Sequence, residues 1–146
     1  MKTVLFICTG NYYRSRFAEE VFNFHASKAD LPWRADSAGL KVPETRHENP
    51  GPISVYAFDA FEDYGVIPIA HQREPKQVTE LLLKSADLII ATSAIEHKPM
   101  AAERIPAFAD QITYWDVEDV EFVEPKIALK NLHQRTLNLL QELEKA

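Results

Sequence analysis

The only cysteine of this 146-residue chain, Cys8, lies where an apolar stretch gives way to small and polar residues. The segment reads VLFICTGNYYRSRFAEEVF over residues 4–22, so that Arg14 follows six positions after the cysteine. The interval is filled by Thr9, Gly10, Asn11, Tyr12 and Tyr13. A loop between a strand and a helix can turn successive backbone N–H groups toward an anion, and the positive end of the helix adds to their attraction.

A thiol in such a loop is predicted to be nucleophilic. The N–H donors and the charge of Arg14 favour the thiolate, and the hydroxyl of Ser15 can stabilise it as it forms and leaves. The planar guanidinium can hold two phosphate oxygens. Gly10 permits unusual dihedral angles, and Asn11 tolerates the left-handed region. Together these residues predict that Cys8 attacks phosphorus. The alternative is that Cys8 is only a small apolar residue, as most lone buried cysteines at strand ends are.

The flanking residues predict the elements that position this loop. Residues 3–8, TVLFIC, have the pattern of a strand buried on both faces, and residues 15–29 place Phe17, Val21 and Phe24 on one helical stripe. Strands alternating with helices predict one α/β domain over residues 1–146, a four-stranded parallel sheet with helices on both faces and ligands at the carboxyl ends of its strands. Further strands are predicted at 33–39, 86–93 and 111–116, helices at 53–65 (opened by Pro52), 79–85 and 124–146, and loops at 41–52 and 66–75.

Composition limits the classes of function. The net charge of −6 provides no basic face for nucleic acid or an anionic membrane. A single cysteine excludes an internal disulfide and a cysteine-rich metal site, and the N-terminal apolar run is too short for a signal peptide. We therefore expect a cytoplasmic protein with no cofactor.

The segment VLFICTGNYYRS resembles the opening of the low-molecular-weight protein-tyrosine phosphatase family, in which a strand precedes Cys-x-Gly-Asn-x-Cys-Arg-Ser-Pro. DSAGL (36–40) and ADLIIATS (86–93) resemble two later family segments, so the resemblance covers the full chain. It implies a flavodoxin-like fold and hydrolysis of phosphotyrosine proteins or small aryl phosphates through a phosphocysteine on Cys8. It also implies inhibition by phosphate or vanadate, and a monomer or weak homodimer.

The resemblance also implies a set of supporting residues. Asn11, Ser15, Ser37 and His71 would hold the phosphate loop through hydrogen bonds. For Ser37 and His71 the alternatives are an ordinary turn serine and a surface histidine.

The chain departs from the family pattern at three places. Tyr13 replaces the second cysteine, and Arg16 replaces the proline, where it either adds a cation near the pocket mouth or is solvated. The usual Asp-Pro pair of the general acid is absent from YWDVEDVEFVEP (114–125). Asp116 and Asp119 are the candidates for that acid. We choose Asp119, on a loop that can swing over the pocket and that the missing proline leaves freer.

Tyr12 and Phe122 could wall a slot for a phenyl phosphate, although Phe122 is equally well explained as a core residue. Three other functions remain open. One is a single-cysteine arsenate reductase coupled to glutathione, and another is a phosphate-binding module with weak turnover. A flavodoxin-like electron carrier is disfavoured by the cysteine and arginine in the first loop.

Overall fold

A computed structural model describes all residues, 1–146, and contains one four-stranded parallel sheet in the order β2-β1-β3-β4. The prediction of a parallel sheet with helices on both faces is confirmed. The strands are β1 (Lys2–Cys8), β2 (Trp33–Gly39), β3 (Leu88–Ala91) and β4 (Ile112–Tyr114). The first strand of the sequence pairs with β2 and β3 and is therefore central.

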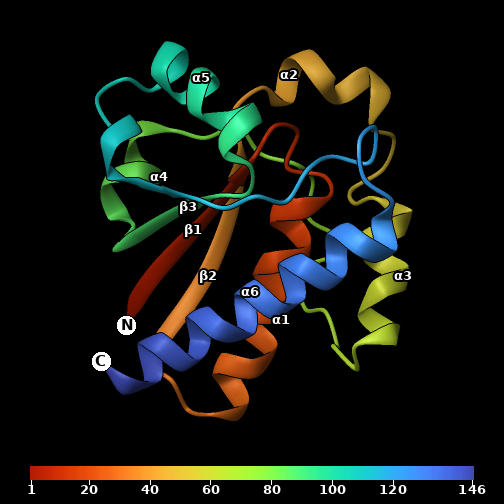
Figure 1. Cartoon of the computed structure of the whole chain (residues 1–146), viewed down its shortest axis with the longest axis vertical. Coiled ribbons are helices and arrows are strands. Elements are labelled where there is room, and N and C mark those ends of the chain that lie inside the picture. Colours follow the sequence, from red (N-terminus) through yellow and green to blue (C-terminus); the bar gives the residue numbers. More distant parts are fainter.

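The alternation of side chains in β1 divides the apolar interior into two cores. Val4 and Phe6 point to one face of the sheet and Leu5 and Ile7 to the other, and all four are buried. The first face is covered by α1 (Arg14–Lys28), α3 (Val55–Asp63) and α6 (Pro125–Lys145), and the second by α4 (Glu80–Ser85) and α5 (Ala94–Arg104), as Figure 1 shows. A strand between two layers of helices explains the unbroken apolar run of the sequence.

The predicted apolar stripe of α1 packs as expected. Phe17 and Val21 are buried, and Phe17 stacks on Phe61 of α3 with ring centroids 5.6 Å apart. Asp30, which follows the helix, has a positive φ of 52° that turns the chain toward β2. This packing fixes the start of α1 beneath the end of β1.

Several boundaries differ from the predictions. The third helix begins at Val55 and is capped by Ser54, whose Oγ accepts from the backbone N–H of Tyr56, so Pro52 lies outside it. The expected loop at 41–52 contains two short helices, α2 (Val42–Thr45) and η1 (Arg46–Glu48), and α5 was not predicted. A further short helix, η2 (Ala109–Gln111), precedes β4.

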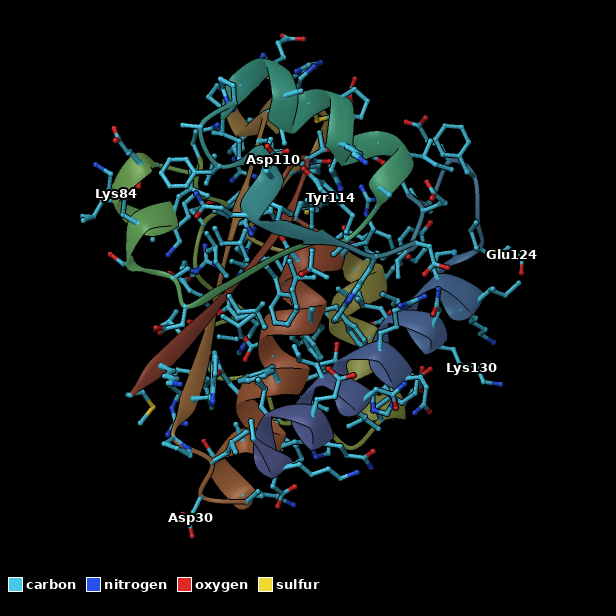
Figure 2. All side chains as sticks on the ribbon, turned by 60° about the vertical axis from the view of Figure 1, so that its left-hand side comes forward. Asp30, Lys84, Asp110, Tyr114, Glu124 and Lys130 are labelled. Carbon is cyan, nitrogen blue, oxygen red and sulfur yellow. The ribbon has the colours of Figure 1, made fainter.

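Most charged side chains away from the loop between β1 and α1 lie on the outside of the molecule. Asp30, Lys84 and Lys130 are exposed and point away from the layers (Figure 2). None of the helices combines the length and the apolar character that crossing a bilayer requires.

Candidate active site

The loop between β1 and α1 lies at the carboxyl end of the central strand, where the sequence predicts an anion site. Asn11 adopts the expected left-handed conformation with a φ of 50°. Gly10 does not have a positive φ, so the prediction of unusual dihedral angles there is wrong. A Cβ atom on Gly10 would lie 2.7 Å from Asn49 Nδ2, the end of a side chain that can move away. Gly39 of β2, by contrast, is needed for space, because a Cβ atom there would lie 2.6 Å from the backbone carbonyl oxygen of Thr9.

A hydrogen bond joins the cysteine to the first turn of α1, with Cys8 Sγ 3.0 Å from Ser15 Oγ. Asn11 determines which of these groups donates. Its Oδ1 accepts from Arg73 Nη1 at 3.1 Å and from the backbone N–H of Lys76 at 3.0 Å, two groups that can only donate. Asn11 Nδ2 therefore donates to Ser15 Oγ at 2.9 Å. The hydroxyl hydrogen of Ser15 is then free to be donated to Cys8 Sγ.

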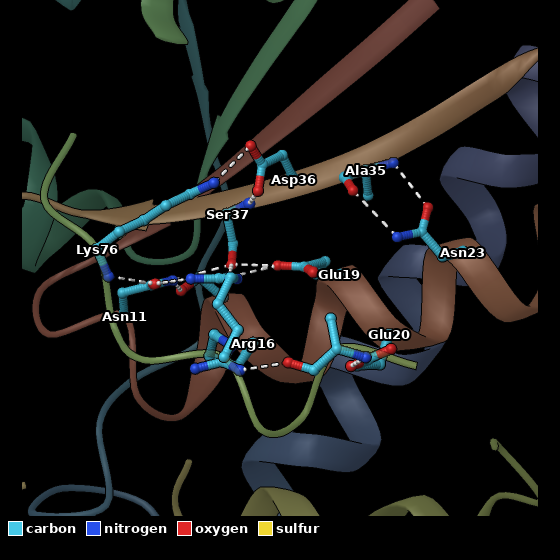
Figure 3. A network of polar contacts seen from close by, with 12 residues as sticks. Asn11, Arg16, Glu19, Glu20, Asn23, Ala35, Asp36, Ser37 and Lys76 are labelled. Atoms are coloured by element: carbon cyan, nitrogen blue, oxygen red, sulfur yellow. Dashed lines mark hydrogen bonds and ion pairs between the residues drawn. The ribbon is translucent and has the colours of Figure 1, made fainter. Parts of the chain in front are cut away.

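Ser37 of β2 lies on the other side of Asn11, in the place that the family resemblance implies. It accepts from Asn11 Nδ2 at 2.9 Å and donates to the carboxylate of Glu19, as Figure 3 shows. Arg73 Nη2 lies 2.9 Å from both Ser37 Oγ and Glu19 Oε1. Burial raises the pKa of the Glu19 carboxyl, although the charge of Arg73 opposes the shift.

His71 lies outside this network, which corrects the prediction for that residue. Its ring packs against Phe58 with centroids 5.3 Å apart, and its buried Nδ1 has no partner. Arg73, two residues later, makes the contacts expected of the histidine. A guanidinium carries five N–H donors, and that of Arg73 reaches four acceptor groups at once, whereas an imidazole has only two nitrogens.

Arg14 is buried beside the cysteine and has one donor without a partner. Its Nη1 donates to the carbonyl oxygen of Val117 at 3.0 Å, and its Nη2 donates to Glu96 Oε2 at 2.8 Å. Its Nε is buried and makes no hydrogen bond. A guanidinium edge formed by Nε–H and one Nη hydrogen matches two oxygens of a phosphoryl group.

Three groups converge on one oxygen of Glu96, which projects from the first turn of α5. Arg14 Nη2 is the first and the hydroxyl of Thr9 the second. The third is His97 Nε2 at 3.1 Å; it carries the hydrogen because His97 Nδ1 accepts from the backbone N–H of Ser93. Burial favours the neutral carboxyl, but the bonds from His97 and Arg14 outweigh it and hold the pKa of Glu96 well below its usual range. Glu96 is therefore a carboxylate anion, and its ion pair holds the guanidinium of Arg14 in place.

Arg16 is fully buried, so neither prediction made for it is correct. Its guanidinium donates to the carbonyl oxygens of Pro52 at 2.6 Å and Ala70 at 2.8 Å. One turn later, the carboxylate of Glu20 accepts from the backbone N–H groups of Ile69 and Ala70 (Figure 3). Both side chains attach the loop at 66–75 to α1.

The two candidate general acids lie in different surroundings. Asp119 lines the cavity that contains Cys8 and Arg14. Asp116 is exposed and forms an ion pair of 2.7 Å with Arg135 of α6, and it does not line the cavity. The geometry therefore favours Asp119, as the sequence predicts.

The loop that carries Asp119 is attached to the rest of the site at two points. Arg14 Nη1 holds the carbonyl oxygen of Val117, and Ser93 Oγ lies 3.0 Å from Glu118 Oε2. Both contacts hold the residues immediately before Asp119. That the missing proline leaves the loop beyond them freer stays a prediction.

The cavity above Cys8 has a volume of about 670 Å³. Tyr12, Tyr13 and Phe122 line it, as expected for walls around an aryl phosphate, and Tyr56 of α3 adds a further ring. Phe122 is 72% exposed and is therefore not a core residue. The hydroxyl of Tyr12 donates to the carbonyl oxygen of Pro50. The hydroxyl of Tyr13 has no hydrogen-bond partner, and burial raises the pKa of Tyr13 to about 12.

Comparison with known proteins agrees with this geometry. The family model of the low molecular weight phosphotyrosine protein phosphatases matches residues 3–146. The chain belongs to this family. Membership implies phosphoester hydrolysis through a cysteine, and Cys8 is the only cysteine available.

Relatives within the family differ in the substrate that their names give. A protein-arginine-phosphatase of Bacillus subtilis (strain 168) is 27% identical over 144 residues, which cover 96% of this chain and 90% of the relative. A low molecular weight protein tyrosine phosphatase from T. tengcongensis is 30% identical, with a TM-score of 0.78 and 100% of both chains covered. The YwlE arginine phosphatase, as a cysteine-to-serine mutant with a phosphorylated active-site serine, has a TM-score of 0.79 at 23% identity, with 98% and 96% of the chains covered. This last likeness shows the fold alone.

Sequence reasoning missed Glu19, Arg73, Glu96 and His97. A signal for Glu96 is present in the sequence, because Ser93 and Glu96 have the spacing of a capping box and predict a helix start. Nothing comparable marks Arg73, which lies in an irregular loop.

Proposed function

We propose that this protein dephosphorylates phosphotyrosine in proteins through a phosphocysteine intermediate on Cys8. The observation that carries the proposal is the hydrogen-bond chain from Arg73 and Lys76 through Asn11 and Ser15 to the sulfur. Each member of that chain has its donor direction fixed by the preceding one, so that the sulfur receives a hydrogen bond suited to an anion.

In the first step, Cys8 Sγ attacks phosphorus as the bond to the tyrosyl oxygen breaks. The unpartnered edge of Arg14 would hold two phosphoryl oxygens, and the backbone N–H groups of the loop would surround the others. Asp119, in its acid form, gives its proton to the departing oxygen, because a phenolate is a poor leaving group. The products are the phosphocysteine and a free tyrosine side chain.

In the second step, a water molecule attacks the phosphocysteine. Asp119, now a carboxylate, takes a proton from the water as the sulfur–phosphorus bond breaks, and inorganic phosphate leaves. The sulfur departs as a thiolate and again accepts the hydrogen bond of Ser15. The aromatic walls formed by Tyr12, Tyr13 and Phe122 support a tyrosyl substrate, because offset and edge-to-face ring contacts are favourable.

The test is hydrolysis of para-nitrophenyl phosphate by the protein and by Cys8→Ser. We expect vanadate-sensitive release of nitrophenol, and a loss of roughly 10³-fold or more in the variant because serine lacks a stabilised anion at neutral pH. Phosphate binding, measured by calorimetry, should persist in Cys8→Ser because the loop and Arg14 remain. Activity of the variant within tenfold of the unmodified protein would contradict the assignment, and phosphate binding without any release of nitrophenol would favour the binding module.

Dephosphorylation of phosphoarginine is a second candidate. The 27% identity to a protein-arginine-phosphatase favours it, and so do Glu118, Asp119 and Glu121 at the cavity, whose carboxylates could pair with a guanidinium. Two peptides that differ only in phosphotyrosine or phosphoarginine separate the candidates. A higher kcat/KM for the phosphoarginine peptide would replace the first proposal by the second.

A further inference from the structure

The entrance of the cavity above Cys8 carries an excess of negative charge. Five carboxylates line the cavity, and Arg14 is the only cationic side chain among the lining residues. Arg14 is already paired with Glu96 at the base, so it does not neutralise the entrance. Of the remaining four, Asp119 is the proposed proton donor, and the other three, Glu48, Glu118 and Glu121, are what we call the acidic rim.

The carboxylates of the acidic rim have little compensation from the protein itself. Glu48 is 69% exposed, and its nearest basic group is the ring of the adjacent His47 at 3.5 Å. Glu118 accepts a hydrogen bond from the neutral hydroxyl of Ser93, and Glu121 takes part in no ion pair. The residues of the rim come from two segments, η1 and the loop before α6, and line the same cavity as Cys8.

This arrangement conflicts with the charge of the phosphoryl group. The buried and unpartnered Nε of Arg14 requires an acceptor such as a phosphate oxygen, whereas the rim repels an anion that approaches alone. Cations placed beside the phosphorylated residue would remove the conflict. Phe122, 72% exposed beside Glu121, offers a ring face on which an arginine or lysine side chain can lie.

We infer that the acidic rim selects phosphorylated protein segments that carry lysine or arginine close to the phosphorylated residue, and rejects acidic segments. This inference rests on the proposed function and names its substrate class. Charges at the edge of an interface act mainly on the rate of association and are screened by salt. The selection therefore appears in kcat/KM at low ionic strength and weakens as salt is added.

The experiment compares three phosphotyrosine peptides of equal length whose neighbours are basic, neutral or acidic. At low salt we expect kcat/KM to fall from basic to acidic by roughly tenfold or more, and the difference to shrink in ~0.5 M salt. The double variant Glu48→Lys, Glu121→Lys should lose most of the preference. For each variant, the readout is kcat/KM for the basic peptide divided by kcat/KM for the acidic peptide. A general loss of activity cancels in this ratio.

The matched control is Glu142→Lys, Glu144→Lys, which changes the net charge equally at the far end of α6. That helix has 21 residues, so its ends lie about 30 Å apart, well beyond the screening length. The control should keep the full preference.

Equal rates for the three peptides at low salt, or faster turnover of the acidic one, would overturn the inference while vanadate-sensitive hydrolysis of para-nitrophenyl phosphate kept the proposed function intact. An equal loss of preference in the control would show that only net charge matters and would also overturn it. No hydrolysis of any of these substrates would overturn the proposed function and the inference together.

Discussion

At the scale of single residues, the site depends on groups whose hydrogen-bonding roles cannot be exchanged. The guanidinium of Arg73 and the backbone N–H of Lys76 can only donate, so they fix the orientation of the Asn11 amide. That orientation in turn commits the hydroxyl of Ser15 to the sulfur of Cys8. The direction of the hydrogen bond to Cys8 Sγ is therefore set by Arg73, Lys76 and Asn11.

Replacing Arg73 should accordingly harm the protein far more than replacing His71. Arg73→Ala leaves Glu19 without its cation in a largely buried site and should cost about 2 kcal/mol in the free energy of unfolding. It should also lower kcat by roughly tenfold, because Asn11 loses one of its two fixing donors. His71→Ala removes only a ring packed on Phe58 and should cost about 1 kcal/mol or less. Urea unfolding and steady-state kinetics measure both effects, and the reverse ranking would contradict the geometry.

The assignment of the general acid is tested by leaving groups of different basicity. Asp119→Asn should slow the hydrolysis of aryl phosphates with basic leaving groups by roughly 10²–10⁴-fold and affect those with acidic leaving groups much less. Protonation matters most where the departing oxygen is most basic. Asp116→Asn is the matched control, since it removes a carboxylate from the same segment that is instead paired with Arg135. A steeper dependence on the leaving group in the control than in Asp119→Asn would assign the acid to Asp116.

At the scale of elements, α5 connects the phosphate loop to the loop of the general acid. Ser93 caps the helix by accepting from the backbone N–H of Glu96, as in a capping box. The side chain of Glu96 does not complete the box, because it turns to Arg14 instead. His97 Nδ1 accepts the backbone N–H of Ser93 in its place. The first turn of α5 thus holds Arg14, the residue proposed to bind the phosphoryl group, in place beside Cys8.

Ser93→Ala should separate the two functions of this cap. It removes the bond to Glu96 N–H and the contact with Glu118, so it should cost about 1 kcal/mol of stability and also slow the substrates with basic leaving groups several-fold. Thr79→Ala is the matched control, because Thr79 caps α4 through Leu82 N–H and lies outside the cavity. The control should lose similar stability and keep its leaving-group dependence. If both variants keep that dependence unchanged, the contact between Ser93 and Glu118 does not hold the acid in place.

The elements that the sequence predicts well are those whose apolar period is undisturbed. The buried strand at 3–8 and the helices at 15–29 and 124–146 were predicted to within a few residues, because burial on one or two faces leaves a clear pattern. The helix α5 was missed because Pro99 lies inside it, where it removes a backbone donor. Tertiary packing and the capping by Ser93 outweigh that cost.

The sequence predicts some residues of the site and not others, and the difference depends on how far each lies from Cys8 along the chain. Residues next to Cys8 in the sequence are constrained by the loop itself, so their places could be predicted. Arg73 and Glu96 come from distant segments that only the folded sheet brings together. The burial of Arg16 was unpredictable from its charge, since its partners are backbone carbonyl groups of two loops.

At the scale of the whole molecule, the presence of a single thiol determines how the protein responds to oxidation. Cys8 is only 2% exposed, but it lines the cavity through which peroxide can reach it. Peroxide converts a thiolate to sulfenic acid, and further exposure converts that to sulfinic acid, which dithiothreitol does not reduce. No second cysteine exists in the chain to capture the sulfenic acid as a disulfide. The fraction of activity recoverable with dithiothreitol should therefore decline steadily with exposure, and bound phosphate should slow the decline by covering the sulfur.

Position 13 is the place at which a second thiol would change this response. Tyr13 and Cys8 line the same cavity, and Tyr13 immediately precedes α1. In Tyr13→Cys, the new thiol can condense with the sulfenic acid of Cys8, forming a disulfide and releasing water, and dithiothreitol would then restore both thiols. Removing the ring also leaves a cavity beside Tyr56, so the control is Tyr13→Ser, which creates nearly the same space without a thiol. We expect recovery after matched peroxide exposure to be higher for Tyr13→Cys than for Tyr13→Ser. Equal recovery in two folded and active variants would mean that the side chain at position 13 does not reach Cys8.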